Sequence, residues 1–105
     1  MRVEPQLAIP VPHEEIAAFC RKWGIRRLAF FGSVVRDDFR PESDVDVLVE
    51  FRDRTPGLKF FWDVPNELSQ ILGGRTVDLL TPASLSNWMK REVAATAVPV
   101  YDEEV

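Results

Sequence analysis

Two stretches of the sequence, FFGSVVR at residues 30–36 and SDVDV at residues 43–47, decide which fold the chain is expected to adopt. An apolar run of strand length from Leu28 to Phe31 stops abruptly at Gly32, the residue type that best tolerates tight turns and close backbone approaches. The second stretch opens the segment from Asp44 to Val49, in which β-branched residues favour a strand. The sequence therefore predicts two strands, with a tight turn at the end of the first.

The turn after the first strand predicts a phosphate-binding site. Ser33 opens a segment of helical character, residues 34–38, so its backbone N–H and its hydroxyl would lie at a helix N-terminus. Unpaired donors and the helix dipole attract anions at such a position. On its own, a Gly-Ser pair at a strand end is more often an ordinary turn, so the phosphate interpretation depends on the carboxylates that follow in the sequence.

Asp44 and Asp46 are two residues apart on the second strand and should point to the same face. Their α-carbons would lie roughly 6.6 Å apart, near enough for the carboxylates to hold cations in a two-metal cluster. Mg²⁺ prefers oxygen ligands of this kind. The alternative is a solvated strand face, but aspartate is depleted in strands and two carboxylates on one face repel each other unless a cation compensates. The composite of turn and carboxylates therefore favours a functional site.

A third carboxylate, Asp78, interrupts the apolar strand expected at residues 75–80. A lone buried carboxylate is costly unless it is paired, protonated or bound to metal. Taken alone, Asp78 would more often be a hydrogen-bonded strand residue that faces water. As the third member of the set it predicts a metal ligand.

The residues that carry the site resemble the signature of the nucleotidyltransferase superfamily that includes DNA polymerase β. In chain order they are Gly32-Ser33-x-x-Arg36, then Ser43-Asp44-x-Asp46, then Asp78 on a later strand. Nearly the whole chain is similar to the smallest branch of that superfamily, the minimal nucleotidyltransferases. The resemblance implies an α/β (α+β) fold in which helices pack on a single small mixed β-sheet.

The resemblance also implies a role for each carboxylate. Asp44 and Asp46 would hold two Mg²⁺ ions, and Asp78 would bind the catalytic ion and help to activate the attacking hydroxyl. The reaction would be an in-line attack on the α-phosphate of a nucleoside triphosphate, with pyrophosphate leaving. Two metal ions can stabilise both the entering and the leaving oxygen without a histidine or a cysteine.

The same resemblance implies contacts to the triphosphate. Gly32 and Ser33 would hold the β- and γ-phosphates, and Ser43 would add a further contact. Arg36 has two interpretations, because its guanidinium can grip phosphate oxygens bidentately or can form ion pairs with its acidic neighbours Asp37, Asp38 and Glu42.

Many members of the resembled branch are antitoxins encoded beside HEPN proteins, and some transfer AMP from ATP to a tyrosine of the toxin. The expected function is therefore Mg²⁺-dependent transfer of AMP, from ATP or another nucleoside triphosphate, to a HEPN-type partner. Two alternatives remain: an antitoxin that neutralises its partner by contact alone, and nucleotidyl transfer to a small molecule. The complete set of three aspartates favours catalysis, and no segment is left over for an acceptor-binding domain, which favours a partner chain.

Length and composition fit one small domain over residues 1–105, with residues 1–11 as a loosely attached arm. A chain of 105 residues buries roughly two-thirds of its unfolded surface, enough for one core. The net charge of −4 argues against strong non-specific binding of nucleic acid. The single cysteine, Cys20, excludes an intramolecular disulfide, and no segment has the pattern of a signal peptide or a membrane span. We therefore expect a cytoplasmic protein.

Helix and strand signals complete the expected fold. Pro12 and Gly24 bound the best-marked helix, in which Cys20 and Trp23 are expected in the core, while His13 at its start is expected in solvent. The remaining expected elements are a strand at 26–31, a short helix at 34–38, the acidic strand from 44 to about 51, a helix at 58–72, a strand at 75–80, a helix at 83–96 and an edge strand at 98–101.

Two features of the predicted 58–72 helix leave its shape and its packing undecided. Pro65 should kink or divide it, because proline removes a backbone donor. Phe60, Phe61 and Trp62 span about 200° of its circumference at 100° per residue, more than one core usually covers. The three aromatics therefore either mark an interface or pack between two elements.

Overall fold

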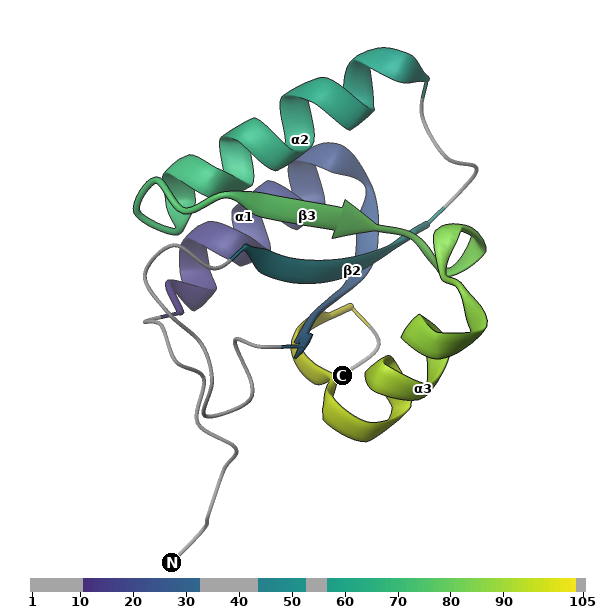
Figure 1. Ribbon diagram of the computed structural model, residues 1–105. Helices are drawn as coiled ribbons and strands as arrows, with labels where there is room; N and C mark the ends of the chain where they lie inside the picture. Colours follow the sequence, from purple (N-terminus) through teal and green to yellow (C-terminus); the bar gives the residue numbers. More distant parts are fainter. Residues whose placement is uncertain (1–10, 33–43, 53–56, 104–105) are drawn as a thin grey trace, which may run out of the picture.

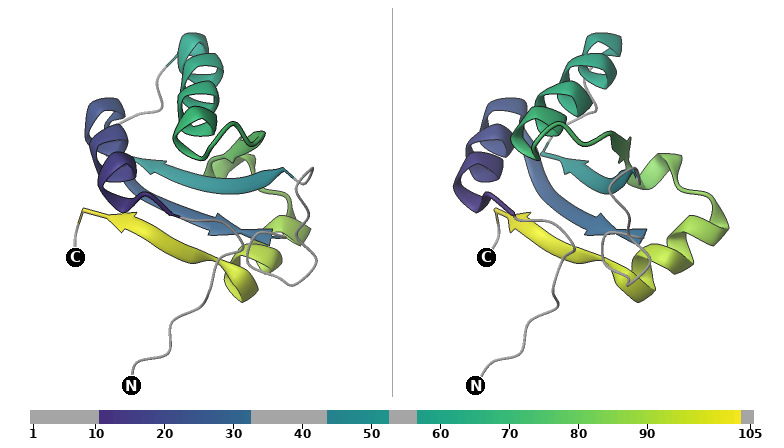
Figure 2. Two further views of the ribbon diagram at one scale, coloured as in Figure 1. Left: turned by 90° about the vertical axis from the view of Figure 1, so that its left-hand side faces the viewer. Right: turned by 60° about the vertical axis from the view of Figure 1, so that its left-hand side comes forward.

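The four strands form one mixed sheet, in the order β3-β2-β1-β4 (Figures 1 and 2). The structure is a computed structural model that describes residues 11–32, 44–52 and 57–103. The strands are β1 (Ile25–Phe31), β2 (Val45–Phe51), β3 (Val77–Leu80) and β4 (Val98–Asp102). β1 pairs antiparallel with β2 and with β4, whereas β2 and β3 run parallel. The predicted α/β (α+β) class with a small mixed sheet is confirmed.

Helices α1 (His13–Trp23) and α2 (Leu58–Ile71) lie together on one side of this sheet, and α3 (Asn87–Thr96) lies apart from them (Figure 2). The alternation along β2 explains the division of the sheet into two faces. Val45, Val47 and Val49 are fully buried, whereas the residues between them remain partly exposed. The buried residues join those of α1, α2 and β1 in one core, whose members include Ile16, Phe19, Leu28, Phe30, Phe60, Val64 and Leu68.

The sequence signals for α1 are confirmed in detail. Pro12 is the N-cap, and Gly24 ends the helix with a φ of 71° while its N–H bonds to the carbonyl of Cys20. Cys20 is fully buried, and this burial raises the pKa of its thiol from 9.0 to about 12. Trp23 packs against the core as expected, and its indole N–H donates to Glu67 Oε2 at 3.2 Å.

Pro65 was expected to kink or divide its helix, but α2 runs as one helix from Leu58 to Ile71. Division is therefore wrong, and the kink stays a prediction. Phe60, Val64 and Leu68 recur every four residues, and each is at most 2% exposed. Because these side chains before and after Pro65 are buried in the same core, they hold the two halves of α2 in a single helix. The side-chain amide of Asn66 donates to the carbonyl of Trp62 at 2.8 Å, which adds a hydrogen bond next to the one that the proline removes.

The last helix begins later than the sequence predicts. Residues Pro82–Ser84 form a short 3₁₀ helix, and α3 starts only at Asn87. Ser84 closes the first turn, because its hydroxyl accepts from the N–H of Thr81 at 2.9 Å and donates to the carbonyl of the same residue at 2.8 Å. Ser86 then caps α3 by accepting from the N–H of Met89 at 3.2 Å. The caps at Ser84 and Ser86 therefore separate the turn from the helix, although the sequence pattern predicts one continuous helix.

β4 lies at one edge of the sheet, as expected, and β3 lies at the other. β4 is an edge strand and accommodates Pro99, which faces Ala29 in the register with β1. β3 is shorter than predicted, since it begins at Val77. The expected short helix at 34–38, residues 1–10 of the expected arm at 1–11, and most of the turn between β2 and α2 lie outside the described residues. Val11, the last residue of that arm, is partly buried and packs against the core, so the prediction of a loose attachment is wrong at this residue. In the part that is described, no helix combines the length and the apolar character that crossing a membrane requires.

Candidate functional site

Asp46 and Asp78 stand side by side on neighbouring strands. They are paired in the parallel register of β2 and β3, so their backbones lie about 4.8 Å apart and both side chains project from the same face. That face is opposite to the one that carries the buried valines of β2. Asp46 is partly exposed and Asp78 is exposed. The structure thus unites two carboxylates, 32 residues apart in the sequence, on an accessible surface.

The third predicted carboxylate, Asp44, lies just before β2 and is exposed. Among the residues that the structure describes, no three His, Cys, Asp or Glu side chains are grouped closely enough to hold a metal ion. The structure therefore brings Asp46 and Asp78 together by strand pairing and leaves Asp44 at the strand entrance. A three-carboxylate cluster is not assembled in this part of the chain.

This donor set nevertheless suits a hard divalent cation. Mg²⁺ commonly binds through one or two carboxylates and takes its other ligands from water and from substrate phosphates. Two adjacent carboxylates on an open face match that requirement better than they match a closed all-protein cage. Asp46 and Asp78, with Asp44 nearby, could hold such an ion once a phosphate supplies further oxygens.

Gly32 lies directly against Asp46, one member of the acidic pair. Its φ is +75°, and a Cβ at this position would collide with Oδ2 of Asp46 and stand 3.3 Å from its Cγ. The contact follows from the register, because the preceding Phe31 pairs with Asp46. The predicted need for glycine at the turn is thus explained by two constraints, a left-handed backbone and a carboxylate that leaves no room for a side chain.

The backbone N–H of Gly32 donates to Oγ1 of Thr96 at 3.1 Å, and the Thr96 hydroxyl donates in turn to the carbonyl of Glu92 at 2.8 Å. Sequence reasoning missed Thr96. It ends α3, and only the pairing of β4 with β1 brings it next to Gly32. A single threonine at a helix end gives no signal by itself, so knowledge of the sheet order was needed to find it.

Ser33, Arg36 and Ser43, the other predicted contacts to phosphate, lie outside the described residues. Their roles, and the choice between phosphate and acidic partners for Arg36, stay predictions. The phosphate contact expected for Gly32 also stays a prediction, with the added finding that its N–H already has a partner.

Farther along the same face, Arg27 is held by two carboxylates. It bonds to Asp102 Oδ2 and to Glu50 Oε2, each at 3.1 Å. The negative charges of these carboxylates, that of Asp102 more than that of Glu50, raise the pKa of Arg27 above its ordinary value. This charge is therefore balanced within the sheet, and Arg27 is a poor candidate for binding the triphosphate.

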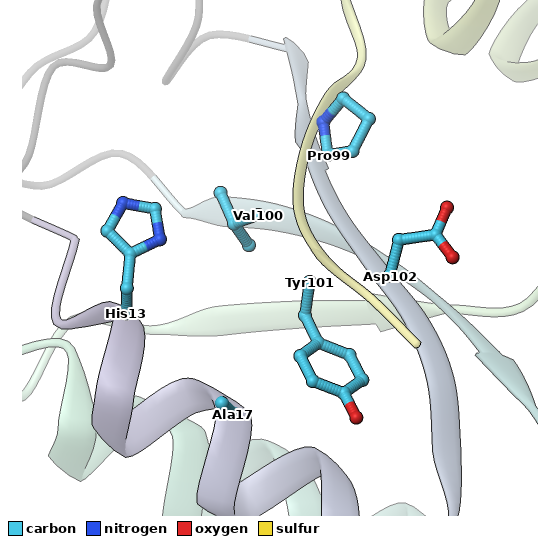
Figure 3. Close-up of a pocket in the computed structure, with 6 residues that line it drawn as sticks. All are labelled: His13, Ala17, Pro99, Val100, Tyr101 and Asp102. Carbon is cyan, nitrogen blue, oxygen red and sulfur yellow. The ribbon is translucent and has the colours of Figure 1, made fainter. Parts of the chain in front are cut away.

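A pocket of about 440 Å³ opens between α1 and β4 (Figure 3). The residues that line it are His13, Ala17, Pro99, Val100, Tyr101 and Asp102. It lies at the β4 edge, and none of the predicted site residues contributes to it. His13 is exposed, as expected. Because the pocket is lined by residues of α1 and β4, it is separate from the acidic pair on β2 and β3.

Comparison with known proteins decides the family. The sequence model of the nucleotidyltransferase domain matches residues 14–101. The chain belongs to this family. The resemblance predicted from the two motifs is confirmed, and so is the expectation of a transferase, since curated relatives are named protein adenylyltransferases. Members of the family generally use a divalent metal ion.

One relative of this nucleotidyltransferase is the protein adenylyltransferase MntA of Thermococcus cleftensis. The two are 37% identical over 79 residues, which cover 75% of this chain and 78% of the relative. Two solved structures share the fold. A chain of a toxin–antitoxin complex with AMP-PNP superimposes with a TM-score of 0.71 at 21% identity, over 88% of this chain and 74% of that one. A chain from a complex of tri-AMPylated Shewanella oneidensis HEPN toxin with MNT antitoxin gives 0.63 at 21% identity, over 88% and 71%.

Proposed function

We propose that this nucleotidyltransferase transfers AMP from Mg²⁺-bound ATP to a tyrosine of a HEPN-type partner, as the antitoxin of a toxin–antitoxin pair. The observation that carries the proposal is the strand-paired placement of Asp46 and Asp78 beside Gly32. Two carboxylates next to a tight turn meet the needs of phosphoryl chemistry, which consists mainly of positioning and charge stabilisation.

The proposed cofactor is a pair of Mg²⁺ ions held by Asp44, Asp46 and Asp78. When bound, the ions would neutralise charge on the triphosphate and stabilise the entering and leaving oxygens. Asp44 and Asp46 would hold the nucleotide, and Asp78 would orient the acceptor hydroxyl and favour loss of its proton. Since no three-carboxylate group stands ready in the described chain, the nucleotide itself would complete the site.

The exposure of Asp78 supports a protein acceptor. A tyrosine on another folded chain can reach the reacting phosphate only across an open surface, and the face that carries Asp78 and Asp44 is open. A small-molecule enzyme would more often bury its substrate in a concave pocket. The pocket in Figure 3 is at the other edge of the sheet and contains none of the three aspartates.

The named relatives support the identity of the partner. The first relative is named a protein adenylyltransferase, and the Shewanella complex pairs an MNT antitoxin with an AMPylated HEPN toxin. We extend both properties to this chain on the strength of the shared family, and we place the reaction in the cytoplasm, where ATP and Mg²⁺ are available.

The second candidate is an antitoxin that acts by contact alone. The finding that favours it is the lack of an assembled three-carboxylate group in the described residues. The two candidates differ in what happens to the partner's mass, because AMP transfer adds a covalent group and contact does not.

The test is to incubate the protein with the HEPN-type chain encoded beside it and Mg²⁺-ATP, and to weigh the partner by intact mass spectrometry. We expect AMP adducts on tyrosine with the wild type and none with Asp46→Asn. Glu50→Gln is the matched control, because Glu50 lies on the same face of the same strand but pairs with Arg27. No adduct, together with stoichiometric inhibition of the partner, would establish the contact-only antitoxin instead.

A further inference from the structure

Helix α3 is covered less completely than the other two helices. α1 and α2 each bury at least three side chains in the core, whereas α3 buries none. Its large apolar residues, Trp88, Met89 and Val93, all remain at least partly exposed. A helix of ten residues is only marginally stable without packing. α3 therefore presents an apolar surface that is available to a second chain.

Trp88 dominates this surface. Its side chain is 63% exposed, and Trp62, at 74%, is the other large apolar side chain that the described part of the chain leaves open to solvent. Exposure of so much apolar area to water is unfavourable, and tryptophan is enriched among the residues that contribute most to binding at protein interfaces. Because partly exposed apolar neighbours accompany Trp88 on α3, it belongs to a patch rather than standing alone.

α3 flanks the acidic pair. Figure 1 shows α3 on the side of β2 and β3 that faces away from α2, which is the side to which Asp46 and Asp78 project. The last residue of α3, Thr96, accepts the N–H of Gly32 at 3.1 Å, and Gly32 lies against Asp46. The 3₁₀ helix that leads from β3 into α3 contacts β2. Both ends of α3 are thus tied to the strands that carry the two carboxylates.

Trp62 lies in a different place. It belongs to α2, which covers the face of the sheet with the buried valines. Phe60, in the same turn of α2, packs edge-on against Phe51 with ring centroids 4.4 Å apart. Phe51 is the last residue of β2, whereas Asp46 is the second. The two exposed tryptophans therefore form a matched pair, one beside the acidic pair and one on the other side of the sheet near the far end of β2.

A folded acceptor has to cover the surface around the acidic pair. In the proposed function a tyrosine of the partner reaches Asp78, and an interface of standard size covers roughly 800 Å² of each partner, a patch about 32 Å across. α3 has ten residues and is about 15 Å long. Because one end of α3 adjoins Gly32, a patch of that width around the acidic pair extends over α3.

We propose that Trp88 anchors the docking of the HEPN-type partner: its indole enters an apolar pocket of that chain while the partner's tyrosine lies against Asp78. The partner thereby covers the apolar surface that α3 leaves open, and Trp62 takes no part. The proposal rests on the proposed function, because it assumes that a tyrosine of a folded chain is brought to the acidic pair.

The test compares Trp88→Ala with Trp62→Ala. Both side chains are largely exposed, so neither truncation should unfold the protein, which circular dichroism checks. Affinity for the HEPN-type chain encoded beside this protein is measured by calorimetric titration. Truncation of an interface anchor weakens binding by roughly 30-fold or more. We expect that loss for Trp88→Ala and no change for Trp62→Ala. In AMP transfer, Trp88→Ala should raise the KM for the partner by the same factor and leave kcat at saturating partner unchanged.

A second measurement uses the wild type alone and so does not depend on the folding of a variant. Amide hydrogen exchange is followed by mass spectrometry with and without the partner. Exchange should slow across α3, because the partner covers it, and should be unchanged in the turn of α2 that carries Trp62. Slowing of exchange in α2 with no effect in α3 would overturn the proposal.

The affinities separate this proposal from the proposed function. If the wild type transfers AMP and Trp88→Ala binds the partner as the wild type does, Trp88 is not the anchor. If both variants lose affinity equally, docking is not centred on α3, and the proposal is again wrong. Absence of AMP adducts with the wild type would instead refute the proposed function, and with it the docking arrangement that brings the tyrosine to Asp78.

Discussion

Replacing Gly32 with alanine should destabilise the protein through two separable costs. The φ of +75° at this residue is left-handed, and a residue with a side chain loses roughly 1–2 kcal/mol there. The new Cβ would also collide with Asp46 Oδ2, and overpacking of this kind costs typically about 1–3 kcal/mol. We therefore expect the free energy of unfolding to fall by about 2–5 kcal/mol, a large share of the roughly 5–15 kcal/mol that a domain has.

Gly24 provides the matched control. Its φ is +71°, but nothing lies within 4 Å of the position that a Cβ would take. Gly24→Ala should therefore show the backbone cost alone, roughly 1–2 kcal/mol. In a chain that already carries Asp46→Ala, the collision is relieved, and Gly32→Ala should fall to the same value.

The assay is urea unfolding followed by circular dichroism, with the slope m compared between variants so that differences in midpoint report stability. The reasoning would be refuted if Gly32→Ala cost no more than Gly24→Ala. It would also be refuted if the Asp46→Ala background left the cost of Gly32→Ala unchanged, because the carboxylate would then not be the source of the collision.

Three further outcomes follow from single groups. Asp78→Asn should lower the rate of AMP transfer by about 10²- to 10⁴-fold with little loss of Mg²⁺-ATP affinity, measured by timed mass spectrometry and titration on one preparation; parallel loss of both would make Asp78 a binding ligand only. Burial raises the pKa of the Cys20 thiol from 9.0 to about 12 in the folded protein. As the pH rises, the unfolded chain therefore loses this proton at a lower pH than the folded protein does. Stability should therefore fall as pH rises above 9, by up to about 1.4 kcal/mol per pH unit. The free energy of unfolding of Cys20→Ala, measured above pH 9, should lack this contribution to the decrease with pH. Arg27→Gln should lower the free energy of unfolding only slightly, because exposed ion pairs contribute little to stability. Urea unfolding at high salt should show a smaller loss still, since Arg27 and its partners are partly exposed; a salt-independent loss would point to packing instead.

The elements near the site were predictable because their signals are local. The apolar run before Gly32 and the valines of β2 carry their own strand pattern, and α1 carries acidic and basic ends with Gly24 after it. The carboxylates of Asp46 and Asp78 could be singled out because each interrupts an apolar strand. Residue type and spacing along the chain were sufficient for these predictions.

What escaped prediction depends on contacts between distant segments or on competing caps. The start of α3 is decided by Ser86 and by the turn that Ser84 closes, although the residues before it also suit a helix. α2 survives Pro65 because burial of its apolar side outweighs one lost bond. Thr96 reaches Gly32 only through the placement of β4 beside β1, which no local pattern encodes.

The order of the strands also has a consequence for how ligands and folding are coupled. Gly32, Asp46, Asp78 and Thr96 come from four segments spread over 65 positions of the chain, and β4 must close against β1 before they meet. An unfolded or partly folded chain therefore lacks the nucleotide site that we propose. A ligand that binds only the native state stabilises it by about 2.7 kcal/mol at a concentration one hundred times its Kd. Mg²⁺-ATP should accordingly slow hydrogen exchange throughout the sheet, and the protein should resist proteolysis best in cells that are rich in ATP.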